Sequence, residues 1–179
     1  MAVKIHIPLA AEQQAVAVEL QGMLVDLLDL TLLGKHAHWN VEGRLFRSVH
    51  HELDDLVDAW RTLSDEVAER AVAIGSTPDG QVEAIAGATQ LDPVPPGHLS
   101  DRQVLRAIGE RIADATSRTR ERIERIAISD PVSVDLLIQV AATLEKQLWM
   151  IRAQIPGTGR VDGDAVETRG DESNGTGRS

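Results

Sequence analysis

The chain of 179 residues contains no cysteine. A disulfide framework is therefore excluded, and so is a structural zinc site built from thiolates. A cysteine-free sequence suits a reducing compartment, so we expect a cytoplasmic protein. The length fits one domain with a sizeable buried core.

Long apolar runs and positive charge are also scarce. The most apolar segment, LVDLLDLTLL from Leu24, is interrupted by Asp26 and Asp29, so we expect no membrane span. Residues 1–10 hold an apolar stretch that is too short for a secretory signal. The formal net charge is −10, which argues against a general affinity for nucleic acid or anionic lipid and favours attraction of cations.

Apolar residues recur at helical spacing in four long segments, which predicts an all-α domain. The expected helices cover about residues 9–39, 47–74, 100–128 and 130–155. We expect Ser48 to cap the second helix, and Ser100 with Gln103 to form a capping box at the third. Asp130 followed by Pro131 indicates the start of the fourth helix.

The longest segment without helical periodicity covers residues 76–98 and contains four prolines. We expect a short helix within it, over residues 81–88. Such a long connection is explained if it returns along the bundle, so that the third helix starts at the same end as the second. This is a ferritin-like four-helix bundle, expected over residues 9–155. Residues 1–8 are expected to form an N-terminal extension, and residues 156–179 a flexible, glycine-rich acidic tail.

Two pairs of potential metal ligands lie in the second predicted helix. His50 and Asp54 are four residues apart, as are Asp65 and Glu69, so each pair lies on one helical face. Imidazole and carboxylate together suit iron, manganese or zinc. Taken alone, either pair is better explained as a surface hydrogen bond or a solvated acidic face, and it is their joint occurrence that favours a metal site.

The two pairs are too far apart to hold one ion within one chain. From Asp54 to Asp65 the helical rise is roughly 16 Å. Either two separate half-sites exist, or each half-site is completed by a second copy through an antiparallel two-fold pairing of this helix. His38 precedes the turn-like residues 40–43, so it faces His50 if that turn closes a helical hairpin.

The segments AHWN at 37–40, VH at 49–50 with Asp54 four residues on, and DEVAER at 65–70 resemble the Dps family of starvation-induced miniferritins. The resemblance implies a hollow homo-oligomer, a dodecamer, that oxidises iron(II) with hydrogen peroxide or oxygen and stores iron(III) mineral. It also implies an intersubunit ferroxidase site that holds iron, with room for two ions. Its ligands would be His38, His50 and Asp54 from one subunit and Asp65 and Glu69 from its neighbour.

Other metal-binding helical proteins fit less well. Typical di-iron bundles use Glu-x-x-His within each subunit. The sequence contains no Glu-x-x-His and no HExxH. An ordinary ferritin and a zinc protease are therefore both disfavoured.

Three further residues acquire roles through the resemblance. Trp39 corresponds to the tryptophan beside the family's iron site, and in a chain without tyrosine it is a candidate radical trap. Packing is the alternative role for Trp39, and we expect Trp60 and Trp149 in the core. Asp130 and Asp135 fall in the region of the family's acidic three-fold pores, through which iron enters, although capping explains Asp130 equally well.

The alternative function is that of a nucleoid-associated, DNA-compacting protein. Many family members bind DNA through lysine-rich tails, because phosphate binding depends on such cations. Here Lys4 is the only basic residue before Lys35, and the C-terminal tail is net acidic. We therefore expect no substantial DNA binding at physiological salt, with association through magnesium or at low pH left open.

Overall fold

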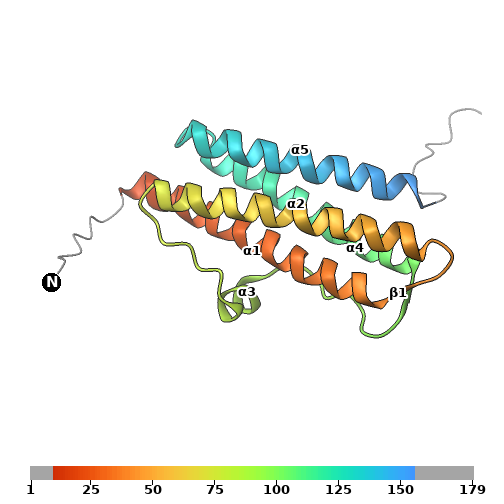
Figure 1. Ribbon diagram of the computed structural model, residues 1–179. Helices are drawn as coiled ribbons and strands as arrows, with labels where there is room; N and C mark the ends of the chain where they lie inside the picture. The colour runs from red at the N-terminus through yellow and green to blue at the C-terminus, as the bar shows by residue number, and fades with distance from the viewer. Residues whose placement is uncertain (1–9, 156–179) are drawn as a thin grey trace, which may run out of the picture.

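The computed structural model describes residues 10–155 and consists almost entirely of helix (Figure 1). Four long helices are joined by short turns and one long crossover, which carries a short helix. The helices are α1 (Ala11–Asn40), α2 (Phe46–Ala73), α3 (Val82–Ala88), α4 (Asp101–Ile126) and α5 (Pro131–Ala153). The predicted all-α bundle with a long crossover is confirmed. The predicted extension 1–8 and tail 156–179 lie outside the described residues.

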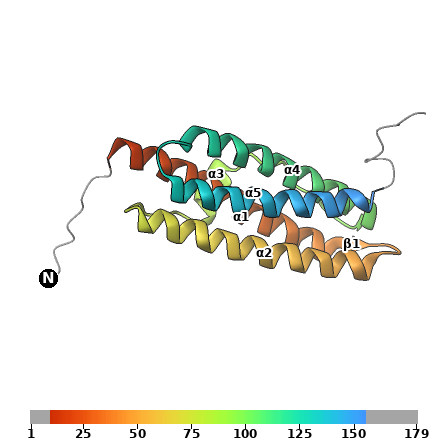
Figure 2. The same ribbon diagram turned by 90° about the horizontal axis from the view of Figure 1, so that it is seen from above.

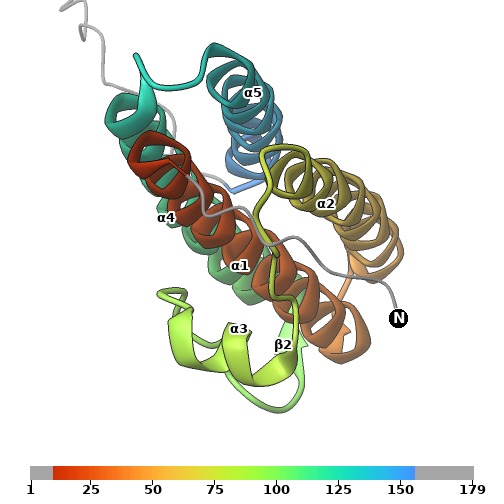
Figure 3. The same ribbon diagram turned by 90° about the vertical axis from the view of Figure 1, so that its left-hand side faces the viewer.

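The four long helices lie side by side around one core. Seen along the bundle, α1, α2, α4 and α5 surround the interior, and α3 lies outside it beside α1 (Figure 3). Trp60 is fully buried, and its indole nitrogen donates to Oε1 of Gln147 at 2.9 Å. Trp149 was expected in the core as well, and this prediction is wrong because 66% of the residue is exposed. None of the described helices has the length and apolarity that crossing a membrane requires.

The crossover makes α2 and α4 start at the same end of the bundle, the end that carries the turn after α1 (Figures 1 and 2). Side chains of α1 and α4 hold it in place. Gln21 exchanges hydrogen bonds with the main chain of Asp79 at 2.8 and 2.9 Å, and Asp29 accepts from the hydroxyl of Thr89. The buried Arg111 guanidinium donates to two successive crossover carbonyls at 3.0 and 2.8 Å. These contacts explain why a proline-rich connection has a defined path.

The turn between α1 and α2 is held against the start of α4. β1 (Val41–Glu42) and β2 (Leu99–Ser100) form a two-residue parallel pair. Gly43 has φ +125°, and a Cβ there would lie 2.7 Å from Oδ2 of Asp101. The same oxygen accepts from the amide of Leu45 at 2.8 Å. This short pairing, which sequence periodicity did not predict, fixes the position of the hairpin.

Helix termini agree with the sequence predictions in two places and differ in one. Ser100 and Gln103 form the expected capping box on α4, and Asp130 caps α5 by accepting from the Val132 amide. Ser48 does not cap α2, whose N-cap residue is Leu45. Ser48 lies inside the first turn, and its hydroxyl donates to the Leu45 carbonyl at 2.9 Å. Asp101, from another helix, accepts from the amide of the N-cap residue Leu45 and so holds the start of α2 in place.

A buried ion network joins α1 to α4. Asp26 is 2% exposed, and its carboxylate accepts from Arg118 at 3.0 and 3.2 Å and from Arg122 at 2.7 Å. A buried carboxylate requires such partners, because desolvation of an unpaired charge is costly. Asp26, which interrupts the most apolar segment of the sequence, therefore connects α1 to α4 through ion pairs.

Candidate metal site

The end of α1 and the start of α2 bring two histidines together. The rings of His38 and His50 stack with their centroids 3.6 Å apart and their planes 24° apart. Each Nδ1 lies 3.0 Å from the main-chain carbonyl oxygen of the other histidine. Because a carbonyl oxygen only accepts hydrogen bonds, each Nδ1 carries the proton and each Nε2 keeps a lone pair for an ion. The reciprocal bonds also fix the orientation of both rings, as is common for metal-binding histidines.

A carboxylate completes a group of three potential ligands. Asp54 lies one turn after His50 on α2, and its Oδ1 is 3.3 Å from Nδ1 of His38. One ligand atom from each of the three residues lies within 4.8 Å of the others. The structure therefore brings together the three residues that the resemblance assigned to one subunit.

The Lys35 side chain contacts this carboxylate. Its ammonium donates to Oδ1 of Asp54 at 2.8 Å. That hydrogen bond is the main reason why the pKa of Asp54 is held below its usual range. The positive charge of Lys35 acts in the same direction, and desolvation of the carboxylate opposes both. Asp54 is thus ionised near neutral pH, as a ligand must be. Sequence analysis did not assign a role to Lys35, although its position one turn before His38 places it on the same face of α1.

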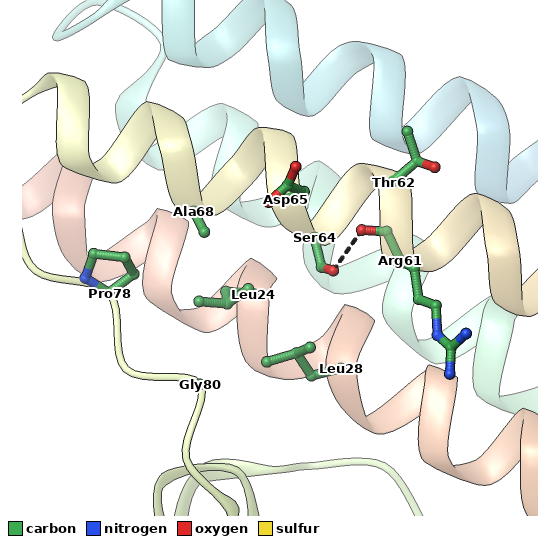
Figure 4. A pocket seen from close by; sticks show the side chains of 9 residues that line it. All are labelled: Leu24, Leu28, Arg61, Thr62, Ser64, Asp65, Ala68, Pro78 and Gly80. Carbon is green, nitrogen blue, oxygen red and sulfur yellow. Dashed lines mark hydrogen bonds between the residues drawn. The ribbon is translucent and has the colours of Figure 1, made fainter.

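Asp65 and Glu69 lie further along α2, and both are exposed. Asp65 lines an open groove of about 650 Å³ between α1, α2 and the start of the crossover (Figure 4). The apolar side chains of Leu24, Leu28 and Ala68 also line this groove. Among residues 10–155, neither acid belongs to a group of three or more residues that could hold an ion. The two sets of candidate ligands are thus separated within one chain, which agrees with the helical rise between them.

Trp39 follows His38 but points away from the core, with 70% of the residue exposed. Its ring centroid is 6.0 Å from the Lys35 ammonium, so it remains beside the three-ligand group. Packing within the subunit, the alternative role, is therefore not what the tryptophan does in this chain. Its role as a radical trap stays a prediction.

The two candidate pore residues have different surroundings. Asp130 accepts from Arg70 and from the Ser133 hydroxyl, each at 2.6 Å, in addition to capping α5. Burial is the largest single influence on its pKa and raises it. The hydrogen bonds from Ser133, Arg70 and the Val132 amide, with the charge of Arg70, together outweigh burial and lower the pKa. Asp135 is exposed and accepts from the Gln139 amide at 2.9 Å. The Asp130 carboxylate therefore joins the end of α2 to the start of α5, whereas Asp135 faces solvent.

Comparisons with known proteins agree with the fold. The sequence matches the ferritin-like domain family over residues 18–160. It is 37% identical over 140 residues to a DNA protection during starvation protein from Mycolicibacterium smegmatis, which covers 78% of this chain and 76% of that protein. It is 34% identical over 139 residues to DNA protection during starvation protein 2 of Deinococcus radiodurans, covering 78% of this chain and 58% of the relative.

A solved structure shows the same architecture. Dps from Microbacterium arborescens, solved in a high iron form, superposes with a TM-score of 0.76 at 30% identity. The superposition covers 82% of this chain and 97% of that one. With most of the bundle matched in sequence and in structure, the chain belongs to the Dps family of ferritin-like proteins.

Proposed function

We propose that the protein oxidises iron(II) at sites shared between two subunits and stores the iron(III) product as mineral inside a hollow homo-oligomer, a dodecamer. The observation that carries the proposal is the division of ligands along α2. Three candidate ligands, His38, His50 and Asp54, meet at one end. Asp65 and Glu69 stand exposed further along the same helix. Neither set alone resembles a closed structural metal site.

A second copy of the chain supplies the missing half. If two α2 helices pair antiparallel about a two-fold axis, the three-ligand group of one subunit lies opposite Asp65 and Glu69 of the other, and two equivalent sites result. The open groove beside Asp65, with Leu24 and Leu28 in its wall, offers apolar surface for such a neighbour. Exposure of both acids in the single chain is what this arrangement requires.

The ligand types suit iron as a substrate. The neutral imidazoles of His38 and His50 bind iron(II), and the carboxylates stabilise the higher charge of iron(III). Two iron(II) ions give one electron each to hydrogen peroxide, which takes up two protons and leaves as two water molecules. Oxygen is the alternative oxidant. The negative charge of the chain raises the local concentration of cations, and removal of both iron(II) and peroxide makes the protein protective.

The decisive experiment is anaerobic loading of the metal-free protein with iron(II), followed by a pulse of peroxide. Size-exclusion chromatography and iron analysis should then find a large assembly that carries many oxidised iron ions per subunit. The variant Asp65→Ala with Glu69→Ala should lose most of the oxidation rate. Asp58→Ala with Glu66→Ala removes the same charge from the same helix outside the site and should keep it. Full activity in the first variant would refute the shared site.

One observation favours DNA binding as a second candidate function. Arg44 and Arg47 lie at the turn before α2 and in its first turn, and Arg102 and Arg106 lie at the start of α4. All four are exposed, and within residues 10–155 none of their guanidinium groups forms an ion pair. The contact between Leu45 and Asp101 brings these two regions together. The resulting basic surface suits phosphate groups even on an acidic protein.

A gel shift on duplex DNA tests this candidate. The assembled protein should retard DNA at low salt, and replacing the four arginines with glutamine should abolish the shift while iron oxidation continues. A shift that needs magnesium and persists in the arginine variant would assign the contact to bridged acidic groups instead. No shift under any condition would remove DNA binding and leave iron oxidation as the function.

A further inference from the structure

The Lys35 side chain forms an ion pair with the carboxylate of Asp54, which is one of the three candidate metal ligands. Its ammonium lies 2.8 Å from Oδ1 of Asp54, the oxygen that also faces Nδ1 of His38 at 3.3 Å. Only 25% of the Lys35 side chain is exposed, so the ammonium is held between α1 and α2 and does not extend freely into solvent. The candidate ligand therefore has a positive partner provided by its own chain.

An ammonium and a divalent ion compete for the same lone pairs. The ammonium only donates hydrogen bonds, so Lys35 cannot itself become a ligand while it is protonated. Two positive charges about 4 Å apart repel each other strongly unless water screens them. An arriving ion must therefore displace Lys35 from Asp54, or bind the other carboxylate oxygen beside a positive charge. Either course lowers the affinity for the ion.

While it is bound to Asp54, the Lys35 ammonium also lies near an aromatic ring. Its ammonium lies 6.0 Å from the ring centroid of Trp39, which is within the range of a cation–π contact. Within residues 10–155, Asp54 is the only carboxylate with which Lys35 forms an ion pair. A lysine displaced from Asp54 therefore still has an aromatic ring within its reach beside the candidate site.

We propose that Lys35 is a displaceable counter-cation, which weakens metal binding at His38, His50 and Asp54 and returns to Asp54 when the ion leaves. A site that passes iron on to a mineral must release each ion, and a resident positive charge favours release. The inference rests on the proposed function, because a counter-cation matters here only if the site binds and releases iron. It assigns to Lys35 a positioning role that controls affinity and exchange.

Cobalt(II) binding to the assembled protein tests this inference without the oxidation reaction. Lys35→Gln removes the charge but keeps a hydrogen-bond donor. We expect this variant to bind cobalt(II) about tenfold more tightly in a calorimetric titration, because one competing ion pair is lost. Release of cobalt(II) to excess chelator should slow by a similar factor. Lys35→Arg keeps the charge and should bind no more tightly than the unaltered protein.

Two control variants separate the possible outcomes. Lys146 is exposed on α5, so Lys146→Gln makes the same change in net charge away from the site and should leave cobalt(II) affinity unchanged. Asp54→Asn should abolish the binding that Lys35→Gln strengthens, which identifies the site. If the unaltered protein binds cobalt(II) through Asp54 and Lys35→Gln binds equally or more weakly, the inference is overturned and the proposed function stands. If no variant binds cobalt(II) at Asp54, the proposed function fails, and the inference with it.

Discussion

His38 and His50 are joined by two reciprocal hydrogen bonds, in which the Nδ1 of each ring lies 3.0 Å from the main-chain carbonyl of the other residue. Neither histidine can change its orientation without breaking a bond to the other. The hairpin between α1 and α2 is therefore part of the candidate metal site, because it determines where both rings lie. Changes that disturb the turn should affect metal binding as well as stability.

Gly43→Ala should test this connection. Alanine would be strained at φ +125°, and its Cβ would lie 2.7 Å from Oδ2 of Asp101. We expect a loss of about 1–3 kcal/mol in the free energy of unfolding, measured with urea, and weaker cobalt(II) binding. Gly87→Ala is the matched control, because nothing lies within 4 Å of its Cβ position in α3. It should stabilise the protein by up to about 1 kcal/mol and leave cobalt(II) binding unchanged.

Periodicity predicted the four long helices because each buries an apolar stripe that recurs along the sequence. The observed bounds differ from the predicted ones by one or two residues at most ends, where local propensity and tertiary contacts compete. The cap of α2 was predicted wrongly because the helix begins at Phe46, before Ser48, where a contact from Leu45 to the distant Asp101 holds the turn. The pairing of β1 with β2 was not predicted either, because a strand of two residues carries no periodic signal.

The candidate site was predictable to the extent that its residues share a helical face. His50 and Asp54 lie four residues apart on α2, and their meeting with His38 required only a hairpin. Lys35 shares a face of α1 with His38, but a lysine on a helix usually faces solvent, so this spacing alone gave no reason to assign it to the site. Only the packing of α1 against α2 shows that its ammonium reaches Asp54. Trp149 is exposed although Leu148 and Ile151 beside it are buried, and hydropathy alone does not tell these positions apart.

The network around Asp26 should dominate the stability of the contact between α1 and α4. Asp26→Ala leaves Arg118 and Arg122 without their buried partner, and we expect a loss of about 3–5 kcal/mol in urea unfolding. Asp58→Ala removes an acid whose side chain is 77% exposed and should change stability by less than about 0.5 kcal/mol. Equal effects of the two substitutions would show that the buried network contributes little.

Stability should depend on the charge of Asp130 at acidic pH. Its pKa in the folded protein is lower than the ordinary value of 3.8, so its contribution is present above that value and is lost as the pH falls through the folded pKa. Asp130→Asn should cost about 1–2 kcal/mol at pH 7, because the contact with Arg70 loses its charge. Urea unfolding at several pH values should show the difference shrinking below about pH 4. A difference that stays constant down to about pH 2 would contradict the role of the ion pair.

Trp39 should protect the rest of the chain if it intercepts oxidising equivalents at the iron site. It lies next to His38 with 70% of its surface exposed, and the absence of tyrosine leaves tryptophan as the readily oxidised aromatic residue. After loading with iron(II) and peroxide, Trp39→Phe should show several-fold more oxidation at other residues, measured by mass spectrometry of peptides. Trp149→Phe is the matched control, since Trp149 is exposed to a similar degree but lies on α5. The same oxidation pattern in both variants and in the unaltered protein would show that Trp39 does not act as a radical trap.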